Sequence, residues 1–245
     1  RVREEIVKLM LTAKPSIGIE YMRETGLLEL FVPELAATVG VTQPTNFHPY
    51  DVYGHSIRAC DAAPSDTAWI RLAALFHDIG KPTCKEGDTF YGHDKVGAEI
   101  TRGILKRLRF SNEDVDRISH LVEEHMFHYL PEWSDSAVRR FIRRVGEENL
   151  EPLFQVRKAD VAGMEREVTD VDLAPLRDRI QKVFAEDQAL HVKQLKVDGN
   201  DVMRELGMPP GRKVGEILNA LLEKVLENPS ENDREKLLEA IRKFK

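Results

Sequence analysis

Residues 72–82 read Leu-Ala-Ala-Leu-Phe-His-Asp-Ile-Gly-Lys-Pro. This stretch predicts an apolar helix that closes on His77 and Asp78 and stops at a Gly-Lys-Pro turn. The small side chains of Ala73 and Ala74 lie about one turn before His77 and leave room beside its imidazole. The imidazole and the adjacent carboxylate can therefore converge on one ion. A capped helix end with a surface histidine and aspartate is an equally good interpretation of this stretch taken alone.

The rest of the chain carries the same helical signature. Apolar residues recur four residues apart, as at Val96, Ile100 and Ile104, and no convincing alternating strand pattern occurs. Asp51 and Ser111 stand at predicted helix starts, where their side chains can accept hydrogen bonds from free backbone N–H groups. The sequence therefore predicts an all-α protein.

The composition excludes several classes of protein. Hydrophobic residues make up 42% and charged residues 32% of 245 residues, with a formal net charge of −6, which excludes a disordered or fibrous chain. Because neither a membrane span nor a secretion signal is recognisable, we expect a cytoplasmic protein with no membrane partner. Cys60 and Cys84 have no metal or redox spacing, so we expect free thiols. The sequence predicts no particular oligomeric state.

Three residues place a polar group on an apolar helix face. Asp160, His125 and His55 each fall at the spacing of the apolar residues around them. A carboxylate in that position is costly unless it is paired or bound to a metal. Arg157 is close enough in helical phase to be a partner of Asp160, and each histidine singly could be an ordinary core residue. Several histidines on different helices together with a buried aspartate favour a shared ion.

These residues carry a family resemblance. The order His55, His77-Asp78, Asp160 resembles the ligand set of the HD-domain metal-dependent phosphohydrolases, and residues 77–82 are similar to the signature helix end of that family. The whole chain further resembles the body and tail of bacterial tRNA nucleotidyltransferases that carry an HD domain, the CCA-adding enzymes and poly(A) polymerases. The segments that carry this second resemblance are residues 23–28, 33–35, 91–93, 158–160 and 206–211.

The resemblance implies a domain plan. It predicts a helical neck at residues 1–40, an HD-domain helical core at 41–168 and a helical tail at 169–245. The polar composition of residues 165–172 independently predicts a domain boundary there. The nucleotidyltransferase head of those polymerases has a Gly-Ser turn after a strand and a pair of Mg²⁺-binding aspartates. Asp170-Val171-Asp172 has no such context and is interpreted as helix capping and solvated charge. We therefore expect no nucleotide addition by this chain alone.

The resemblance also implies a divalent metal ion. His55, His77, Asp78 and Asp160 would bind it, and mixed imidazole and carboxylate donors suit Mg, Mn, Fe, Co, Ni or Zn. Asp78 would orient or deprotonate the attacking water, and Lys81 would neutralise a phosphate oxygen. The alternative for Lys81 is an exposed lysine in a turn.

Two further histidines extend this candidate site. His93 and His125 are candidates for a second metal or for binding the substrate phosphate. The expected substrates are phosphomonoesters or nucleotide phosphodiesters, with 2′,3′-cyclic nucleotides favoured by the resemblance.

Basic residues raise the question of RNA binding. Four arginines cover one face of a predicted helix, Arg139, Arg140, Arg143 and Arg144, and a second cluster comprises Arg102, Lys106, Arg107 and Arg109. Arg212 and Lys213 follow a Pro-Gly turn at a helix start, which suits an RNA phosphate. The alternative is a salt-bridged surface helped by Glu147 and Glu148. The resemblance makes tRNA a candidate partner.

Two hypotheses of different classes follow. The first is an HD phosphohydrolase carried on a tRNA-nucleotidyltransferase-like body. The second is the tRNA-binding body and tail of a CCA-adding enzyme or poly(A) polymerase, with an idle HD site.

Overall fold

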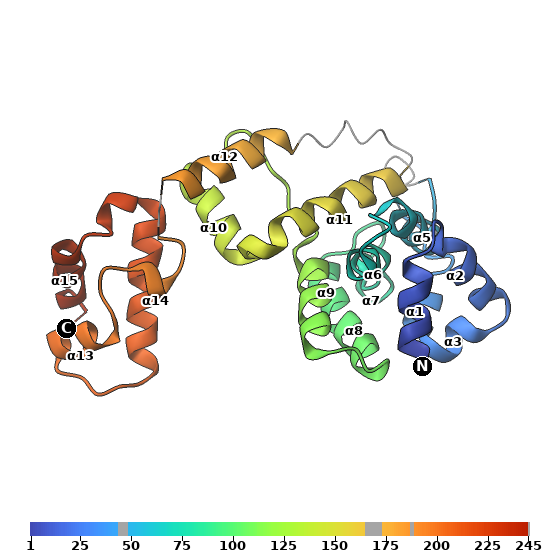
Figure 1. The fold of residues 1–245 in the computed structure, drawn as a ribbon, viewed down its shortest axis with the longest axis horizontal. Helices are drawn as coiled ribbons and strands as arrows, with labels where there is room; N and C mark the ends of the chain where they lie inside the picture. Colours follow the sequence, from blue (N-terminus) through green and yellow to red (C-terminus); the bar gives the residue numbers. More distant parts are fainter. Residues whose placement is uncertain (44–48, 165–172, 187–188, 245) are drawn as a thin grey trace. The chain divides into compact units, whose positions relative to one another are not determined.

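The computed structural model describes residues 1–43, 49–164, 173–186 and 189–244, which form helices joined by loops (Figure 1). Within these ranges the only β-type pairing is a bridge between Glu86 and Thr89, which confirms the all-α prediction. The chain divides into two compact units, one of Arg1–His128 with Glu148–Asp172 and the other of Tyr129–Glu147 with Leu173–Lys245.

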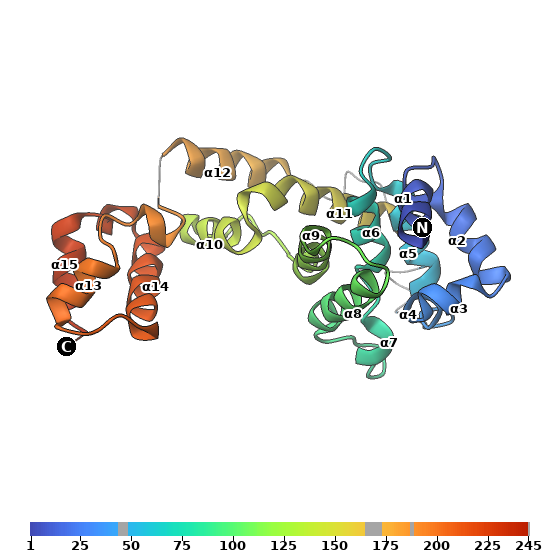
Figure 2. The ribbon, with the colours of Figure 1, turned by 60° about the horizontal axis from the view of Figure 1, so that its bottom comes forward.

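The first unit is a helical cluster around one apolar core. Its helices are α1 (Val2–Met10), α2 (Pro15–Glu24), α3 (Leu27–Phe31), α4 (Pro33–Ala36), α5 (Val52–Ala62), α6 (Ala68–Phe76), α7 (Lys81–Cys84), α8 (His93–Arg107), α9 (Asn112–Glu124) and α11 (Leu150–Gly163). Helix α5 packs on α6 and α11, and α9 packs on α6 and α8 (Figure 2). Ile104, Ile118 and Leu153 are fully buried in this core, so apolar burial holds these helices together.

The second unit has its own core. Its α-helices are α10 (Asp135–Val145), α12 (Ala174–Ala185), α13 (Gly199–Leu206), α14 (Arg212–Glu227) and α15 (Arg234–Arg242). Helix α10 packs on α12 and α14, and α15 packs on α13 and α14. Leu222, Leu226 and Ile241 are fully buried between these helices.

Helices α5 and α9 begin at the N-cap residues that the sequence predicts. The Asp51 side chain accepts a hydrogen bond from the Gly54 N–H at 2.7 Å, and the Ser111 hydroxyl accepts one from the Asp114 N–H at 3.1 Å. Each cap satisfies one backbone donor that would otherwise lack a partner at the start of α5 or α9. His77 is the C-cap of α6, so the His77-Asp78 pair stands at the helix end.

A close backbone approach brings the end of α6 to the start of α8. A Cβ atom at Gly80 would lie 2.3 Å from the carbonyl oxygen of His93 and 2.6 Å from the Gly97 nitrogen. Only glycine fits such a contact. Gly80 thereby sets His93 close to the pair at the end of α6.

The expected domain plan stays a prediction. The polar stretch 165–172, including Asp170-Val171-Asp172, lies outside the described residues. The division into two units differs from the plan in one respect, because Tyr129–Glu147 groups with the C-terminal residues.

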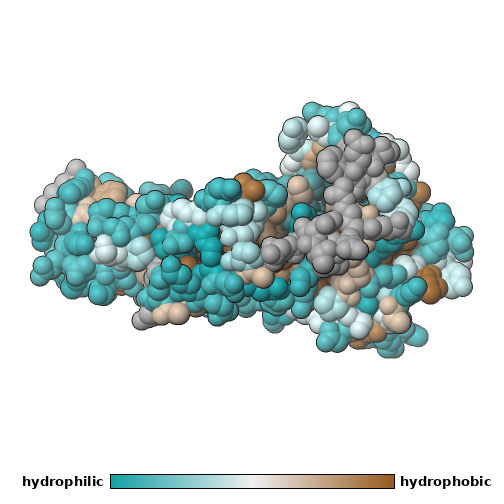
Figure 3. Space-filling model, turned by 90° about the horizontal axis from the view of Figure 1, so that it is seen from above, coloured by the Kyte–Doolittle hydropathy of each residue, from teal (hydrophilic) through white to brown (hydrophobic). Residues whose placement is uncertain are grey.

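The face drawn in Figure 3 is largely hydrophilic with scattered apolar residues. Among the described helices, none combines the length and the apolar character that crossing a bilayer requires. Cys60 is buried, Cys84 is partly exposed, and both are free thiols.

Candidate metal centre

Six buried polar side chains converge at the ends and faces of five helices in the first unit. They are His55 on α5, His77 and Asp78 at the end of α6, His93 at the first residue of α8, His125 at the C-cap of α9, and Asp160 on α11. None of the six is more than 6% exposed. Burying so many polar groups together is costly unless they pair or share an ion.

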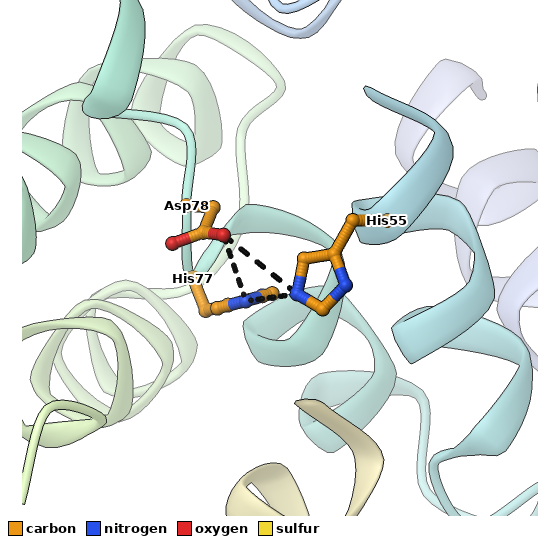
Figure 4. Close-up of side chains that lie close together, drawn as sticks. All are labelled: His55, His77 and Asp78. Carbon is orange, nitrogen blue, oxygen red and sulfur yellow. Dashed lines mark hydrogen bonds and ion pairs between the residues drawn. The ribbon is translucent and has the colours of Figure 1, made fainter. Parts of the chain in front are cut away.

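The first cluster is formed by His55, His77, Asp78 and Asp160. His55 Nε2 lies 3.1 Å from His77 Nε2 and 3.0 Å from Asp160 Oδ1. Asp78 Oδ2 lies 3.3 Å from His77 Nε2 and 3.7 Å from His55 Nε2. Figure 4 shows His55, His77 and Asp78 facing one another. Their donor atoms lie within 4.8 Å of one another, which is close enough for one ion to contact them all.

The second cluster uses the other oxygen of the same carboxylate. Asp78 Oδ1 lies 3.3 Å from His93 Nε2 and 3.9 Å from His125 Nε2. Within the described residues these two Nε2 atoms are buried and make no hydrogen bond. Asp78, His93 and His125 form a second group with metal-binding spacing. Asp78 is therefore shared by two candidate cation sites.

The tautomers of three histidines favour metal binding. His77 Nδ1 donates to the Ala74 carbonyl at 2.7 Å, His93 Nδ1 to Phe90 at 2.8 Å, and His125 Nδ1 to Val122 at 2.6 Å. Because a carbonyl only accepts, the proton lies on Nδ1 and the Nε2 lone pair of a neutral ring faces the cluster. Orientation through the second ring nitrogen is usual for metal-binding histidines.

Burial and neighbouring charges shift the pKa values of three residues of the site. Burial disfavours a charged His77, but the carboxylates of Asp78 and Asp160 outweigh burial and raise the pKa of His77 to about 10. Despite burial, the charges of His77 and Lys81 hold the pKa of Asp78 well below its usual range. Burial, together with the charge of His77, lowers the pKa of His125 to about 4, so that ring is neutral at pH 7.

Two cations hold the carboxylates in place. Lys81 Nζ lies 2.6 Å from Asp78 Oδ2, and Arg157 donates to Asp160 Oδ2 at 2.7 Å. Lys81 is 7% exposed, so the alternative of an exposed turn lysine is wrong. Arg157 is indeed a partner of Asp160, as the alternative interpretation had it, but it takes one oxygen while the other faces His55.

One residue of the site carries no sequence signal. Gln43 Oε1 accepts a hydrogen bond from Lys81 Nζ at 2.6 Å, and Gln43 is buried. It lies 38 residues before Lys81, outside any helix. No periodicity or motif points to it.

The predicted RNA-binding arginines of the second unit have partners within that unit. Arg139 is buried and donates to the Leu226 carbonyl at 2.6 Å. Arg140 pairs with Glu223 and Glu227, and Arg143 pairs with Glu223. The guanidinium carbon of Arg144 lies 5.7 Å from the centre of the Phe141 ring, Arg212 pairs with Glu216, and Lys213 is exposed. The α10 arginines therefore form a salt-bridged surface, as the alternative interpretation predicts. Their partners are Glu223 and Glu227 on α14 and not Glu147 and Glu148. RNA binding by these residues stays a prediction.

Comparison with known families agrees with this geometry. Residues 47–174, more than half of the chain, match the family described as HD domain. The chain therefore belongs to the HD-domain family, whose members bind divalent metal ions, and the His and Asp clusters are the residues here that could hold them. Residues 1–38 match the family described as probable RNA and SrmB-binding site of polymerase A.

Two similar proteins are tRNA nucleotidyltransferases, and a third is a multifunctional CCA protein. The chain is 37% identical over 238 residues to the CC-adding tRNA nucleotidyltransferase of Thermus thermophilus, covering 91% of this chain and 52% of the relative. It is 36% identical over 236 residues to the A-adding tRNA nucleotidyltransferase of Deinococcus radiodurans, covering 91% and 53%. It is 35% identical over 150 residues to the multifunctional CCA protein of Cupriavidus necator, covering 59% and 36%. The chain spans about half the length of the first two relatives.

Proposed function

We propose that this chain is the tRNA-binding body of a tRNA nucleotidyltransferase. Support comes from the similarity to CC-adding and A-adding enzymes over 91% of the chain. This reading is favoured over a free-standing phosphohydrolase, because the similarity includes the segments on both sides of the HD-domain match.

A basic groove in the first unit suits the RNA backbone. It has a volume of about 470 Å³, and the basic residues among those that line it are Arg1, Arg3, Arg107 and Arg109, of which Arg107 is paired with Glu34 at 2.7 Å. Arg3 and Arg109 come from distant parts of the sequence, and Arg3 donates to the Arg109 carbonyl at 2.8 Å. Clustered arginines neutralise phosphates and make the affinity for RNA fall with salt.

The tRNA proposal is tested by binding. We expect the chain to retard tRNA in a native gel, with an affinity that falls linearly in a plot of log affinity against log salt. Replacing Arg3 and Arg109 by alanine should flatten that slope, whereas Lys8→Ala, at an exposed lysine paired with Glu5, should not. Failure of the chain to bind tRNA at low salt contradicts this proposal.

We further propose that the HD centre is a working phosphohydrolase site. The observation that carries this proposal is the sharing of Asp78: Oδ2 faces His55 and His77, and Oδ1 faces His93 and His125. Imidazoles on both sides of one carboxylate offer mixed nitrogen and oxygen donors to a pair of divalent cations.

The cations and the side chains around them would have different roles in the hydrolysis of a phosphate ester. Divalent cations held here would lower the pKa of a bound water and polarise a phosphoryl oxygen. The low pKa of Asp78 keeps it ionised, so orienting the attacking water suits it better than accepting a proton. Lys81 and Arg157 both line the adjacent cavity, where their charges can oppose the charge that develops on phosphate oxygens.

Hydrolysis of 2′,3′-cyclic AMP with a panel of divalent metals tests this second proposal. We expect metal-dependent turnover by the chain, lost in Asp78→Ala and retained in Asp66→Ala, which changes an exposed aspartate just before α6. Absence of turnover with every metal, from folded protein, would leave the HD site idle and the tRNA-binding body as the function.

A further inference from the structure

Gln43 is a buried amide side chain that lines a cavity of about 490 Å³ beside the metal centre. Its Oε1 accepts a hydrogen bond from Lys81 Nζ at 2.6 Å, and its Nε2 donates to the Tyr50 carbonyl at 3.5 Å. Because a carbonyl only accepts, the bond to Tyr50 turns the amide so that its oxygen faces the ammonium. Gln43 is therefore oriented as an acceptor for Lys81.

The segment that ends at Gln43 is anchored to two helices. The Val52 N–H at the start of α5 donates to the Val41 carbonyl at 3.0 Å. Lys85, the C-cap of α7, donates from Nζ to the Thr42 carbonyl at 2.9 Å and to the Thr42 hydroxyl at 2.7 Å. These contacts fix the backbone next to Gln43, so the amide can hold another side chain in place.

Lys81 keeps one N–H for a ligand. Its ammonium has three donors, and among the described residues the acceptors within hydrogen-bond distance are Gln43 Oε1 and Asp78 Oδ2, each at 2.6 Å. A single contact would let this flexible side chain pivot, whereas two contacts fix the direction of the third N–H. Lys81 lines the same cavity as Gln43, so an anion bound there can accept a hydrogen bond from Lys81.

The neutral charge of Gln43 matters for such an anion. Asp78 already offsets the charge of Lys81, and Asp88 and Asp94 also line the cavity. A further carboxylate beside Lys81 would hold the ammonium equally well, but it would repel an anion in the cavity. An amide instead orients the ammonium and adds no negative charge.

We propose that Gln43 is a positioning residue that directs the Lys81 ammonium toward one oxygen of a phosphate group bound in the cavity. The inference rests on the proposed phosphohydrolase function and adds to that site a residue outside its metal ligands. Gln43 acts through Lys81. Its contribution to phosphate binding should therefore vanish when the amine of Lys81 is removed.

A double-mutant cycle tests this dependence. Calorimetry would measure the binding of inorganic phosphate to the full chain loaded with Mn²⁺, and plasma mass spectrometry would check the metal content. We expect Gln43→Leu to weaken phosphate binding by about 10-fold, as for the loss of one hydrogen bond to a charged group, and to have no further effect in Lys81→Met. Gln43→Glu should also weaken phosphate binding, because its charge offsets that of the ammonium. Gln181→Leu, at an exposed position on α12, is the matched control.

The outcomes separate this inference from the phosphohydrolase proposal. Unchanged phosphate affinity in Gln43→Leu or in the isosteric Gln43→Glu, or additive losses in the double variant, overturns the positioning role even if 2′,3′-cyclic AMP is hydrolysed. Loss of Mn²⁺ from the Gln43 variants also overturns it, because Gln43 would then act on the metal centre. A loss of phosphate binding that depends on Lys81, without hydrolysis of 2′,3′-cyclic AMP, supports the positioning role and contradicts the phosphohydrolase.

Discussion

His55 Nε2 and His77 Nε2 lie 3.1 Å apart in the buried centre of the first unit. Two imidazole nitrogens at this distance repel each other unless a proton or a cation lies between them. Because the pKa of His77 is raised to about 10, the His77 ring carries this proton when no metal is bound. A divalent metal would replace the proton. The Oδ1 atom of Asp78 lies 3.3 Å from His93 Nε2 and 3.9 Å from His125 Nε2, so a second cation could bind between these three side chains.

Removing the second cluster should cost one cation and leave the other. We expect His93→Ala with His125→Ala to bind one equivalent of Mn²⁺ fewer than the unchanged chain, and Asp78→Ala to weaken both sites. Metal content after gel filtration, measured by plasma mass spectrometry, reports the stoichiometry. Identical metal content in the double variant and the unchanged chain would contradict the shared role of Asp78.

Metal binding should release protons. The pKa of His77 is raised to about 10, so at pH 7 the metal-free ring carries a proton that the cation displaces. Titration calorimetry in buffers of different ionisation enthalpy should show about one proton released per first metal bound. Release of no proton at pH 7 would mean that His77 is not a ligand.

The metal-free protein should lose stability at alkaline pH. The pKa of His77 is raised from 6.5 to about 10, so its stabilising contribution is complete below pH 6.5 and disappears as the pH rises through 10. Urea unfolding in a chelator should therefore give a free energy of unfolding that falls between these values. The slope should be smaller in His77→Ala, and an unchanged slope would contradict the assignment.

The second unit should lose stability at acidic pH. Hydrogen bonding from Arg234, together with the Asp198 backbone and Arg204, lowers the pKa of Asp201 to about 2 in spite of burial. Its contribution is present above the ordinary value of 3.8 and is lost as the pH falls through 2. Asp201→Asn should flatten the acid limb of stability against pH, whereas Asp178→Asn, at an exposed position on α12, should leave it unchanged.

Gly80 should be irreplaceable. An added Cβ would meet the His93 carbonyl at 2.3 Å, so Gly80→Ala should destabilise the protein by about 1–3 kcal/mol and weaken metal binding. Gly103→Ala is the matched control on α8, because nothing lies within 4 Å of its added Cβ. This second change should stabilise the helix by about 0.5–1 kcal/mol. Thermal unfolding of both variants checks the contrast.

Helical phase and local contacts explain which features could be predicted from the sequence. Asp160 and His125 could be predicted to be buried, because helical spacing decides which face a residue occupies. Gln43 could not be found, because its contact with Lys81 joins a loop to a helix far along the chain.

The arginines of α10 also show that the sequence alone does not reveal contacts between distant segments. Local spacing groups Arg140 and Arg143 on one face, and it cannot reveal their partner Glu223, which lies 80 or more residues later on α14. A cluster of charges in the sequence therefore indicates a face but not whether that face is free.

The most direct test of the shared metal centre is a crystal structure with Mn²⁺, using anomalous scattering to locate the ions. We expect two peaks, one beside Asp78 Oδ2 among His55, His77 and Asp160, and one beside Asp78 Oδ1 between His93 and His125. Absence of any peak in contact with Asp78 at saturating Mn²⁺ would contradict this expectation.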